Sequence, residues 1–302
     1  MGKEILILGG TGPLGRNVTD FFLKKGYNVY LFNRGLHTLT QNSDAKLIIG
    51  NRQNLNDLSK LKSISPDYVI DTLGWFPETL NEIINIFSNK IKGYIFISSA
   101  SVYPGSSDRF FNEETPITSV NPIWANIGLQ KKHCEEILKS AENSFPVVIL
   151  RLSHLLGVPG TLSRETFLTK EILMGHRVYI PDDGNAKLQF ISCSQTAEVC
   201  FEIISKMLFL ERYNIFNLTS AKCWTIKEWI KQFAQWLNLD VKYEFMEYSS
   251  QTKNRFIYQP GNVMMDNRKI EKILGYKLKS PDKSDIEVYI DEKGIADLSP
   301  VT

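Results

Sequence analysis

The stretch ILILGGTGPLG, residues 5–15, decides the fold of this chain. Its first four residues are all apolar and are followed by glycine, which indicates a strand buried on both faces of a parallel sheet. Apolar residues at Val18, Phe21 and Phe22 then indicate a helix with one apolar side. A strand, a glycine-rich turn and a helix in this order form a cradle for a phosphate group.

The three spaced glycines of the turn suit a dinucleotide. Gly9 allows a tight turn, Gly12 lets the backbone approach a pyrophosphate, and Gly15 lets helix and strand pack closely. The free N–H groups at the helix N-terminus favour an anion. A turn with no ligand is the alternative. The predicted contacts to the dinucleotide in this segment are Gly9, Thr11, Gly12, Pro13, Leu14 and Gly15.

Composition excludes several classes of function. The 302 residues include 35 Lys and Arg against 33 Asp and Glu, so no strong field favours nucleic acid or a membrane surface. Four cysteines without a CxxC pair argue against a zinc site and for a reducing compartment. The first apolar run is too short for a signal peptide or a membrane span. We expect a cytoplasmic protein without a metal.

Short apolar strands alternate with helical patterns over the first half of the chain. This alternation predicts an α/β fold with a Rossmann-type, doubly wound parallel sheet. Strands are expected at residues 5–8, 28–32, 46–49, 68–71, 94–98 and 147–150, and helices near 54–61, 78–87 and 125–141.

Beyond Arg151 the pattern changes to longer loops and a mixture of elements. We expect a dinucleotide-binding domain over residues 1–152 and a smaller mixed α/β substrate lobe mainly over 153–302. Segments from later in the chain can also belong to the first domain. The ligand crevice is expected between the lobe and the carboxyl ends of the strands. Residues 291–302 are expected to be poorly ordered. The predicted elements are helices near 167–174, 195–208 and 226–237 and strands at 177–180 and 214–217.

The segment Ser98-Ser99-Ala100-Ser101-Val102-Tyr103 follows the fifth predicted strand. With it and the glycine motif, the chain resembles the extended short-chain dehydrogenase/reductases, in the epimerase/dehydratase branch, over nearly its whole length. The other segments that carry the resemblance are Asn33-Arg34-Gly35, Val69–Thr72, Arg151 with Leu155-Leu156-Gly157, Gln189–Ile191 and Phe216–Leu218.

The resemblance implies that Ser99 hydrogen-bonds the reacting oxygen of the substrate. A hydroxyl at a strand end can polarise a carbonyl or hold an alkoxide. The alternative is that Ser98 and Ser99 only cap the strand. In similar proteins the acid/base group is a tyrosine four residues before a lysine. Here Lys131 matches the lysine, which places Ile127 at the position of the tyrosine. If Lys132 matches instead, Gly128 is at that position. No tyrosine lies between residues 103 and 179. The sequence thus predicts an atypical active site.

Three residues remain as catalytic candidates beside Ser99. The resemblance implies that Lys131 binds the nicotinamide ribose; a solvated lysine is the alternative. His154, after the sixth strand, is the first candidate for a substitute proton donor, although a structural histidine fits equally well. Tyr103 is the second candidate. His133 lies on another side of its helix and is expected at the surface.

Residues after the second and third strands bear on the choice of cofactor. A carboxylate after the second strand is typical of an NAD site, but Arg34 stands there and suits the 2′-phosphate of NADP. We therefore expect NADP rather than NAD, with Asn51 accepting from the adenine amino group. The other predicted contacts to the cofactor are Asn33, Arg52, Thr72, Leu73, Gly74 and Ser98.

Two hypotheses of function follow. The first is an NADP-dependent enzyme of the epimerase/reductase type that acts on a sugar nucleotide or another oxygenated metabolite, with Arg164 and Arg177 available for an anionic substrate. The second is an NADP(H)-binding sensor or scaffold without chemistry. RNA binding, known in related chloroplast proteins, ranks third because no basic stripe supports it. The resemblance also implies a possible homodimer.

Overall fold

The computed structural model describes residues 3–10, 12–35, 44–157, 163–261 and 263–289. Thr11 and residues 291–302, for which predictions were made, lie outside this part of the chain. Among the described residues, no helix has the length and apolar character needed to cross a bilayer.

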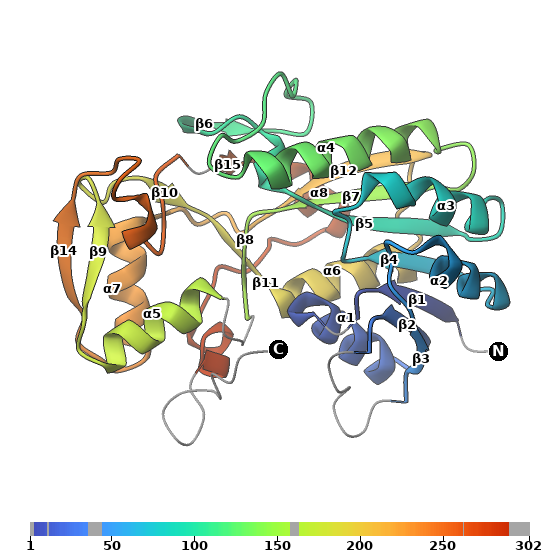
Figure 1. Cartoon of the computed structure of the whole chain (residues 1–302), viewed down its shortest axis with the longest axis horizontal. Helices are drawn as coiled ribbons and strands as arrows, with labels where there is room; N and C mark the ends of the chain where they lie inside the picture. Colours follow the sequence, from blue (N-terminus) through green and yellow to red (C-terminus); the bar gives the residue numbers. More distant parts are fainter. Residues whose placement is uncertain (1–2, 11, 36–43, 158–162, 262, 290–302) are drawn as a thin grey trace.

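A seven-stranded parallel sheet forms the centre of the molecule, in the order β12-β7-β5-β4-β1-β2-β3 (Figure 1). The order reverses between β1 and β4, and doubly wound sheets bind ligands at such a point, beyond the carboxyl ends of the strands. The predicted fold class is thereby confirmed. The strands are β1 (Glu4–Leu8), β2 (Asn28–Asn33), β3 (Lys46–Ile49), β4 (Tyr68–Asp71), β5 (Gly93–Ser99), β7 (Val147–Leu152) and β12 (Tyr213–Leu218).

Helices cover both faces of this sheet, which explains the uninterrupted apolar strands. Ile5 and Ile7 pack against α1 (Pro13–Lys24), α6 (Cys193–Ser205) and α8 (Arg268–Leu274). Leu6 and Leu8 point to the opposite face, where α2 (Leu55–Ser59), α3 (Pro77–Phe87) and α4 (Ala125–Ser140) lie. Successive residues of a strand face opposite sides, so both sets become buried.

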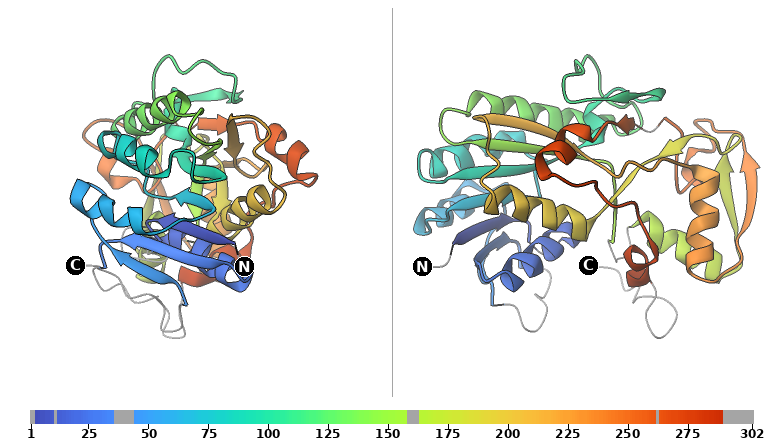
Figure 2. Two further views of the ribbon diagram at one scale, coloured as in Figure 1. Left: turned by 90° about the vertical axis from the view of Figure 1, so that its right-hand side faces the viewer. Right: turned by 180° about the vertical axis from the view of Figure 1, so that it is seen from behind.

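A second group of elements with its own apolar core lies at one end of the sheet (Figure 2). Its helix α7 begins with a capping box between Thr225 and Glu228 and buries Trp229 and Phe233. The group contains α5 (Arg164–Leu173), β9 (Arg177–Pro181), β10 (Lys187–Leu188), β13 (Trp224–Thr225), α7 (Ile226–Trp236) and β14 (Lys242–Met246).

Short paired strands join the two groups. The pairs are β8 (His154–Leu156) with β11 (Phe190–Ser192), and β6 (Ser106–Phe111) with β15 (Val263–Met265). The remaining elements are 3₁₀ helices at Lys60–Ser63, Ala100–Val102, Lys253–Arg255, Lys283–Asp285 and Glu287–Tyr289.

Two elements differ from expectation. The helix predicted at 54–61 ends at Ser59 and continues as a 3₁₀ turn. The strand predicted at 214–217 belongs to the central sheet, where β12 pairs with β7, and α6 packs against α1. Segments beyond residue 152 thus return to the sheet, because Phe216 and Leu218 are apolar residues that bury there.

Candidate functional site

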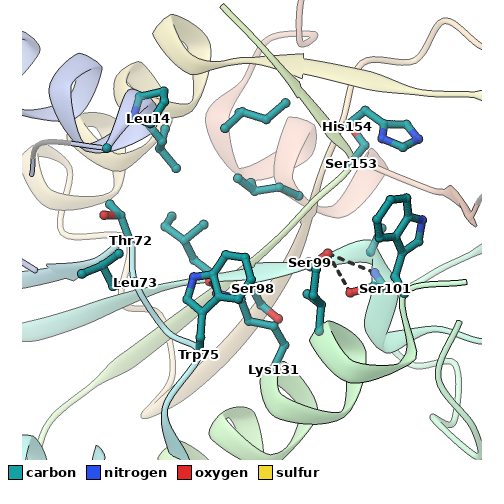
Figure 3. Close-up of a pocket in the computed structure, with 18 of the residues that line it drawn as sticks. Leu14, Thr72, Leu73, Trp75, Ser98, Ser99, Ser101, Lys131, Ser153 and His154 are labelled. Atoms are coloured by element: carbon teal, nitrogen blue, oxygen red, sulfur yellow. Dashed lines mark hydrogen bonds between the residues drawn. The ribbon is translucent and has the colours of Figure 1, made fainter. Parts of the chain in front are cut away.

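Two connected cavities lie at the carboxyl ends of the strands. The inner cavity, of about 470 Å³, is lined by Ser99, Ile127, Lys131 and His154 among others (Figure 3). The β2-end cavity, of about 320 Å³, lies beyond β2 and includes Arg34. They share Gly9, Gly12, Leu73 and Trp75, so together they form one elongated site.

The glycine turn lies where the two cavities meet. Gly9 has φ +92°, and a Cβ there would lie 2.2 Å from Leu73 Cγ. A Cβ on Gly15 would lie 2.3 Å from the carbonyl oxygen of Gly9. At Gly12, by contrast, a Cβ would meet only that same oxygen, at 3.7 Å. Gly12 therefore leaves open space for a ligand, and as the N-cap of α1 it has no side chain to cover the first N–H groups.

Asn33 and Arg34 lie at the end of β2. Asn33 is buried; its Oδ1 accepts a hydrogen bond from Gly35 N, whereas its Nδ2 has no partner among the described residues. Arg34 is exposed. The residues described as lining the β2-end cavity include two arginines and no carboxylate. A buried donor without a partner, beside an open phosphate cradle, fits a dinucleotide.

Arg52 lines the β2-end cavity, but its charge is directed elsewhere. Its Nη1 donates to Asp71 Oδ1 at 2.6 Å, and both residues are buried. Asp71 also accepts from Tyr94 Oη and Leu73 N. Burial alone would raise the pKa of Asp71, but the charge and hydrogen bond of Arg52 outweigh it and lower the pKa. The structure therefore makes Arg52 a support for the turn after β4.

The remaining predicted contacts differ in where they lie. Thr72 and Ser98 line the inner cavity, Asn51 lines the β2-end cavity, and Leu73 lines both. Asn51 Oδ1 already accepts from Gln53 N but has a second lone pair. Gly74 is not among the described residues that line either cavity; it packs against Phe96, from which a Cβ on Gly74 would lie 2.0 Å away.

Ser98 and Ser99 face different surroundings at the end of β5. Ser98 Oγ donates to Glu135 Oε1 at 2.5 Å and is buried. Ser99 Oγ accepts from the backbone N and the Oγ of Ser101, at 3.1 and 2.9 Å (Figure 3). Ser99 thus caps the 3₁₀ turn and also borders the inner cavity, and because both contacts are accepted, its own proton remains to be donated.

Of the two pairs that the sequence left open, Lys131 and Ile127 line the inner cavity, whereas Lys132 and Gly128 are not among the described residues that line it. Lys131 Nζ donates to the Ile97 carbonyl oxygen at 2.5 Å and lies 5.6 Å from the Trp75 ring centre. Burial lowers the pKa of Lys131 to about 8. Gly128 packs against Ser101, where a Cβ would lie 2.3 Å from the carbonyl oxygen. A hydrocarbon side chain, that of Ile127, thus lies four residues before Lys131 at the inner cavity.

Tyr103 does not lie at the cavity. Its ring is fully buried, its Oη donates to Asn217 Oδ1, and it accepts from Arg151 Nη1. Burial raises the pKa of Tyr103 to about 12. The expectation that Tyr103 is a second proton donor is therefore wrong. Tyr103 instead belongs to a buried network in which Arg151 also pairs with Glu135 at 2.6 Å.

His154 begins β8 and borders the inner cavity. Its Nδ1 lies 3.2 Å from Arg164 Nη1, and the Arg164 guanidinium lies 4.7 Å from the Trp124 ring centre. His133 is exposed, as predicted. Arg164 also borders a third cavity, the lobe cavity, of about 530 Å³, whose lining includes Arg177, Tyr179, Arg255 and Phe256.

Several residues of these cavities were not predicted from the sequence. Trp75 borders both connected cavities, and Arg255 joins Arg164 and Arg177 in the lobe cavity. Neither belongs to a local motif, since three separate segments of the chain bring the arginines together. The only available signal was the aromatic residue directly after Gly74.

Comparisons with known proteins agree with this arrangement. The model of the NAD dependent epimerase/dehydratase family matches residues 5–218. A UDP-glucose 4-epimerase of Lactobacillus helveticus is 21% identical over 94% of each chain. The solved UDP-glucose 4-epimerase of Thermotoga maritima with UDP-glucose has a TM-score of 0.74 at 17% identity, covering 94% of this chain and 96% of that one. A dTDP-glucose 4,6-dehydratase of Bacillus anthracis with NAD has a TM-score of 0.77 at 15% identity, covering 95% and 96%.

Proposed function

The chain belongs to the NAD dependent epimerase/dehydratase family, and we propose that it is an NADP(H)-dependent enzyme of this family that acts on a sugar nucleotide or a related oxygenated metabolite. The observation that carries the proposal is the continuity of the β2-end and inner cavities across Gly12. One end offers Asn33 and Arg34 to an adenosine moiety, and the other offers Ser99 and Lys131 to the reacting groups.

The preference for NADP rests on the charge around the β2-end cavity. Arg34 is exposed there, and the described lining has no carboxylate that would repel a 2′-phosphate. Asn33 Nδ2, buried without a partner among the described residues, supports contact with a ribose oxygen. Four of the similar structures contain NAD, so the proposed preference distinguishes this chain from them.

The substrate class rests on the lobe cavity. Arg164 and Arg255 border it with Tyr179 and Phe256, a combination of charge and aromatic surface that suits the phosphates and base of a nucleotide. Arg177 is also there, although Glu244 pairs with it at 2.7 Å. Similar proteins named for UDP-glucose and dTDP-glucose chemistry agree with this choice.

The bound nicotinamide would supply hydride chemistry at the inner cavity. The Ser99 hydroxyl donates a hydrogen bond to the reacting oxygen and stabilises charge that develops there. Lys131 Nζ, beside the inner cavity, binds the ribose hydroxyls. Because Ile127 has no proton to exchange, we assign to His154 the proton that the substrate oxygen receives when a carbonyl is reduced, with solvent reprotonating the ring. When a hydroxyl is oxidised, water takes up the proton that leaves it. Acid/base groups typically contribute about 10²–10⁴-fold, so slow turnover is expected.

A panel of UDP- and dTDP-sugars tests this proposal through changes in nicotinamide absorbance and product analysis. We expect slow turnover in the wild type and loss of at least about tenfold in Ser99→Ala, since an oxyanion donor is removed. Ser140→Ala, at the end of α4, is the control and should retain full activity.

The hydrocarbon at Ile127 supports a second candidate, an NADP(H) sensor without chemistry. Its distinguishing sign is an unequal affinity for NADP⁺ and NADPH together with no turnover on the whole panel, because only differential binding can shift a conformation. Equal affinities without turnover would exclude both candidates.

A further inference from the structure

Lys131 places a positive charge at the inner cavity without a counter-ion of its own. The side chain is 4% exposed and lines the cavity together with Trp75 (Figure 3). The carboxylates whose charges act on Lys131 are those of Asp71 and Glu135. Each of them is already paired with a buried arginine, and no ion pair of Lys131 occurs in the described part of the chain. The ammonium form is therefore buried without the compensation that such a charge requires.

The surroundings of Lys131 Nζ favour the neutral amine. An ammonium group has three N–H donors. Among the described residues, one acceptor bonds it, the carbonyl oxygen of Ile97 at 2.5 Å. Aromatic rings lie beside it, with the ring centre of Phe96 at 4.9 Å and that of Trp75 at 5.6 Å. Burial among such groups disfavours the charged form, and it lowers the pKa of Lys131 to about 8.

A neutral lysine amine has a lone pair and is a nucleophile. Ile127 lies one helical turn before Lys131 and borders the same cavity, and its hydrocarbon side chain has no donor or acceptor to bond the amine. A desolvated lysine in an apolar pocket is the arrangement that attacks carbonyl carbon. The inner cavity, of about 470 Å³, gives a small carbonyl compound room beside the amine.

The walls of the cavity favour an aromatic reactant. Trp75, Trp124 and Ile127 line the inner cavity together with Lys131. Trp75 is 41% exposed, so its ring offers apolar surface that a planar ligand can cover. An aldehyde group also needs less room at its carbonyl carbon than a ketone does. An aromatic aldehyde therefore fits with its ring against Trp75 and its carbonyl carbon near Nζ.

We propose that Lys131 is a site of covalent modification, at which the amine forms a Schiff base with an aromatic aldehyde that enters the inner cavity. The lone pair of Nζ attacks the aldehyde carbon, and the electron pair of the C=O bond moves to oxygen. Nζ then forms a C=N bond, and the oxygen leaves as water with the two hydrogens of the amine. No oxidant or reductant takes part. The adduct occupies the amine that the proposed function assigns to the cofactor ribose, so modification should inhibit the protein.

Labelling of the full chain with salicylaldehyde, an aromatic aldehyde whose imines are coloured, tests the proposal. Reduction with borohydride fixes each imine as a secondary amine, and peptide mass spectrometry gives the occupancy of each lysine. Each unit by which a pKa falls raises the neutral fraction of an amine about tenfold, so we expect Lys131 to be labelled at least about tenfold faster than Lys132 at neutral pH. Equal labelling of these two neighbours would overturn the proposal.

Lys132→Arg is the matched control, because Lys132 is the next residue of α4 and pairs with Glu136 at 3.9 Å. Lys131→Arg should abolish the fast coloured product, whereas Lys132→Arg should retain it. A fast product that survives in Lys131→Arg would place the reactive amine elsewhere and overturn the proposal.

Trp75→Ala tests the aromatic class of the reactant. Labelling of Lys131 by salicylaldehyde should slow by roughly 2–10-fold, the worth of one aromatic contact, while labelling by butanal, which has no ring, should keep its rate. Equal slowing with both aldehydes would overturn the aromatic preference. The experiments contain no cofactor and no sugar nucleotide, so their outcome does not depend on the proposed function.

Discussion

Ile127 and Lys131 lie one helical turn apart on α4, and both border the inner cavity. The lysine is 4% exposed and keeps its contact with the Ile97 carbonyl oxygen. The inner cavity thus has a buried lysine and, four residues earlier on the same helix, a hydrocarbon side chain. This relationship explains why the cofactor site and the acid/base chemistry must be tested separately.

Replacing Ile127 by tyrosine should restore the missing acid. The new phenol would lie four residues before Lys131, whose charge favours the phenolate. We expect turnover on the sugar nucleotide that the wild type uses to rise by about 10²-fold, the lower end of what acid/base catalysis contributes. Steady-state kcat is the measurement. Leu129→Tyr, on the exposed side of α4, is the control. If kcat of Ile127→Tyr is unchanged while cofactor binding is normal, a catalytic role for a side chain at position 127 is contradicted.

Lys131 should make stability depend on pH in the alkaline range. Its folded-state pKa of about 8 lies below the ordinary 10.5, so between these values the unfolded chain binds more protons than the folded protein. The free energy of unfolding of the wild type, relative to Lys131→Met, should therefore rise with pH by up to about 1.4 kcal/mol per unit in this window. Urea denaturation from pH 7 to 10 measures the effect. Lys132→Met should show no such trend, and a flat difference for Lys131→Met would refute the assignment.

The buried ion pair of Glu135 on α4 with Arg151 on β7 should contribute strongly to the free energy of unfolding. Arg151→Met would leave the Glu135 carboxylate buried without its cation, at a cost of about 3–5 kcal/mol in the free energy of unfolding. Glu135→Leu in the same chain should recover part of the loss. Arg177→Met breaks an exposed pair and should cost within about 1 kcal/mol. Equal losses in the two single variants would show that the ion pair is not what holds β7 to α4.

Two glycines of the turn should separate folding from cofactor binding. An alanine at Gly15 places Cβ against backbone atoms of Gly9, so thermal stability and NADPH binding should both fall. An alanine at Gly12 meets no atom closer than 3.7 Å, so stability should stay near that of the wild type while the methyl group fills the pyrophosphate cradle. Thermal unfolding and NADPH titration give the two readouts. Retained binding in Gly12→Ala would mean that the ligand lies elsewhere.

Local patterns predicted the elements of the central sheet, because residues such as Ile5–Leu8 need only be apolar to bury on two faces. The resemblance predicted Lys131 at the crevice, and Lys131 on α4 does line the inner cavity. Local patterns failed for Tyr103, whose hydroxyl bonds Asn217 from a strand 114 residues away. The ion pair of Arg52 with Asp71 on β4 was not predicted for the same reason, although Arg52 lines the β2-end cavity. Residues positioned by distant partners carry no local signal.

Fluorescence titration with NADPH and NADH in parallel, on the wild type and Arg34→Ala, tests the central claim most directly. We expect the wild type to bind NADPH more tightly than NADH. In Arg34→Ala the NADPH affinity should fall by roughly 10–100-fold, the worth of a charge-assisted hydrogen bond, while NADH affinity stays unchanged. Tighter binding of NADH by the wild type, or no binding of either nucleotide, would contradict the account.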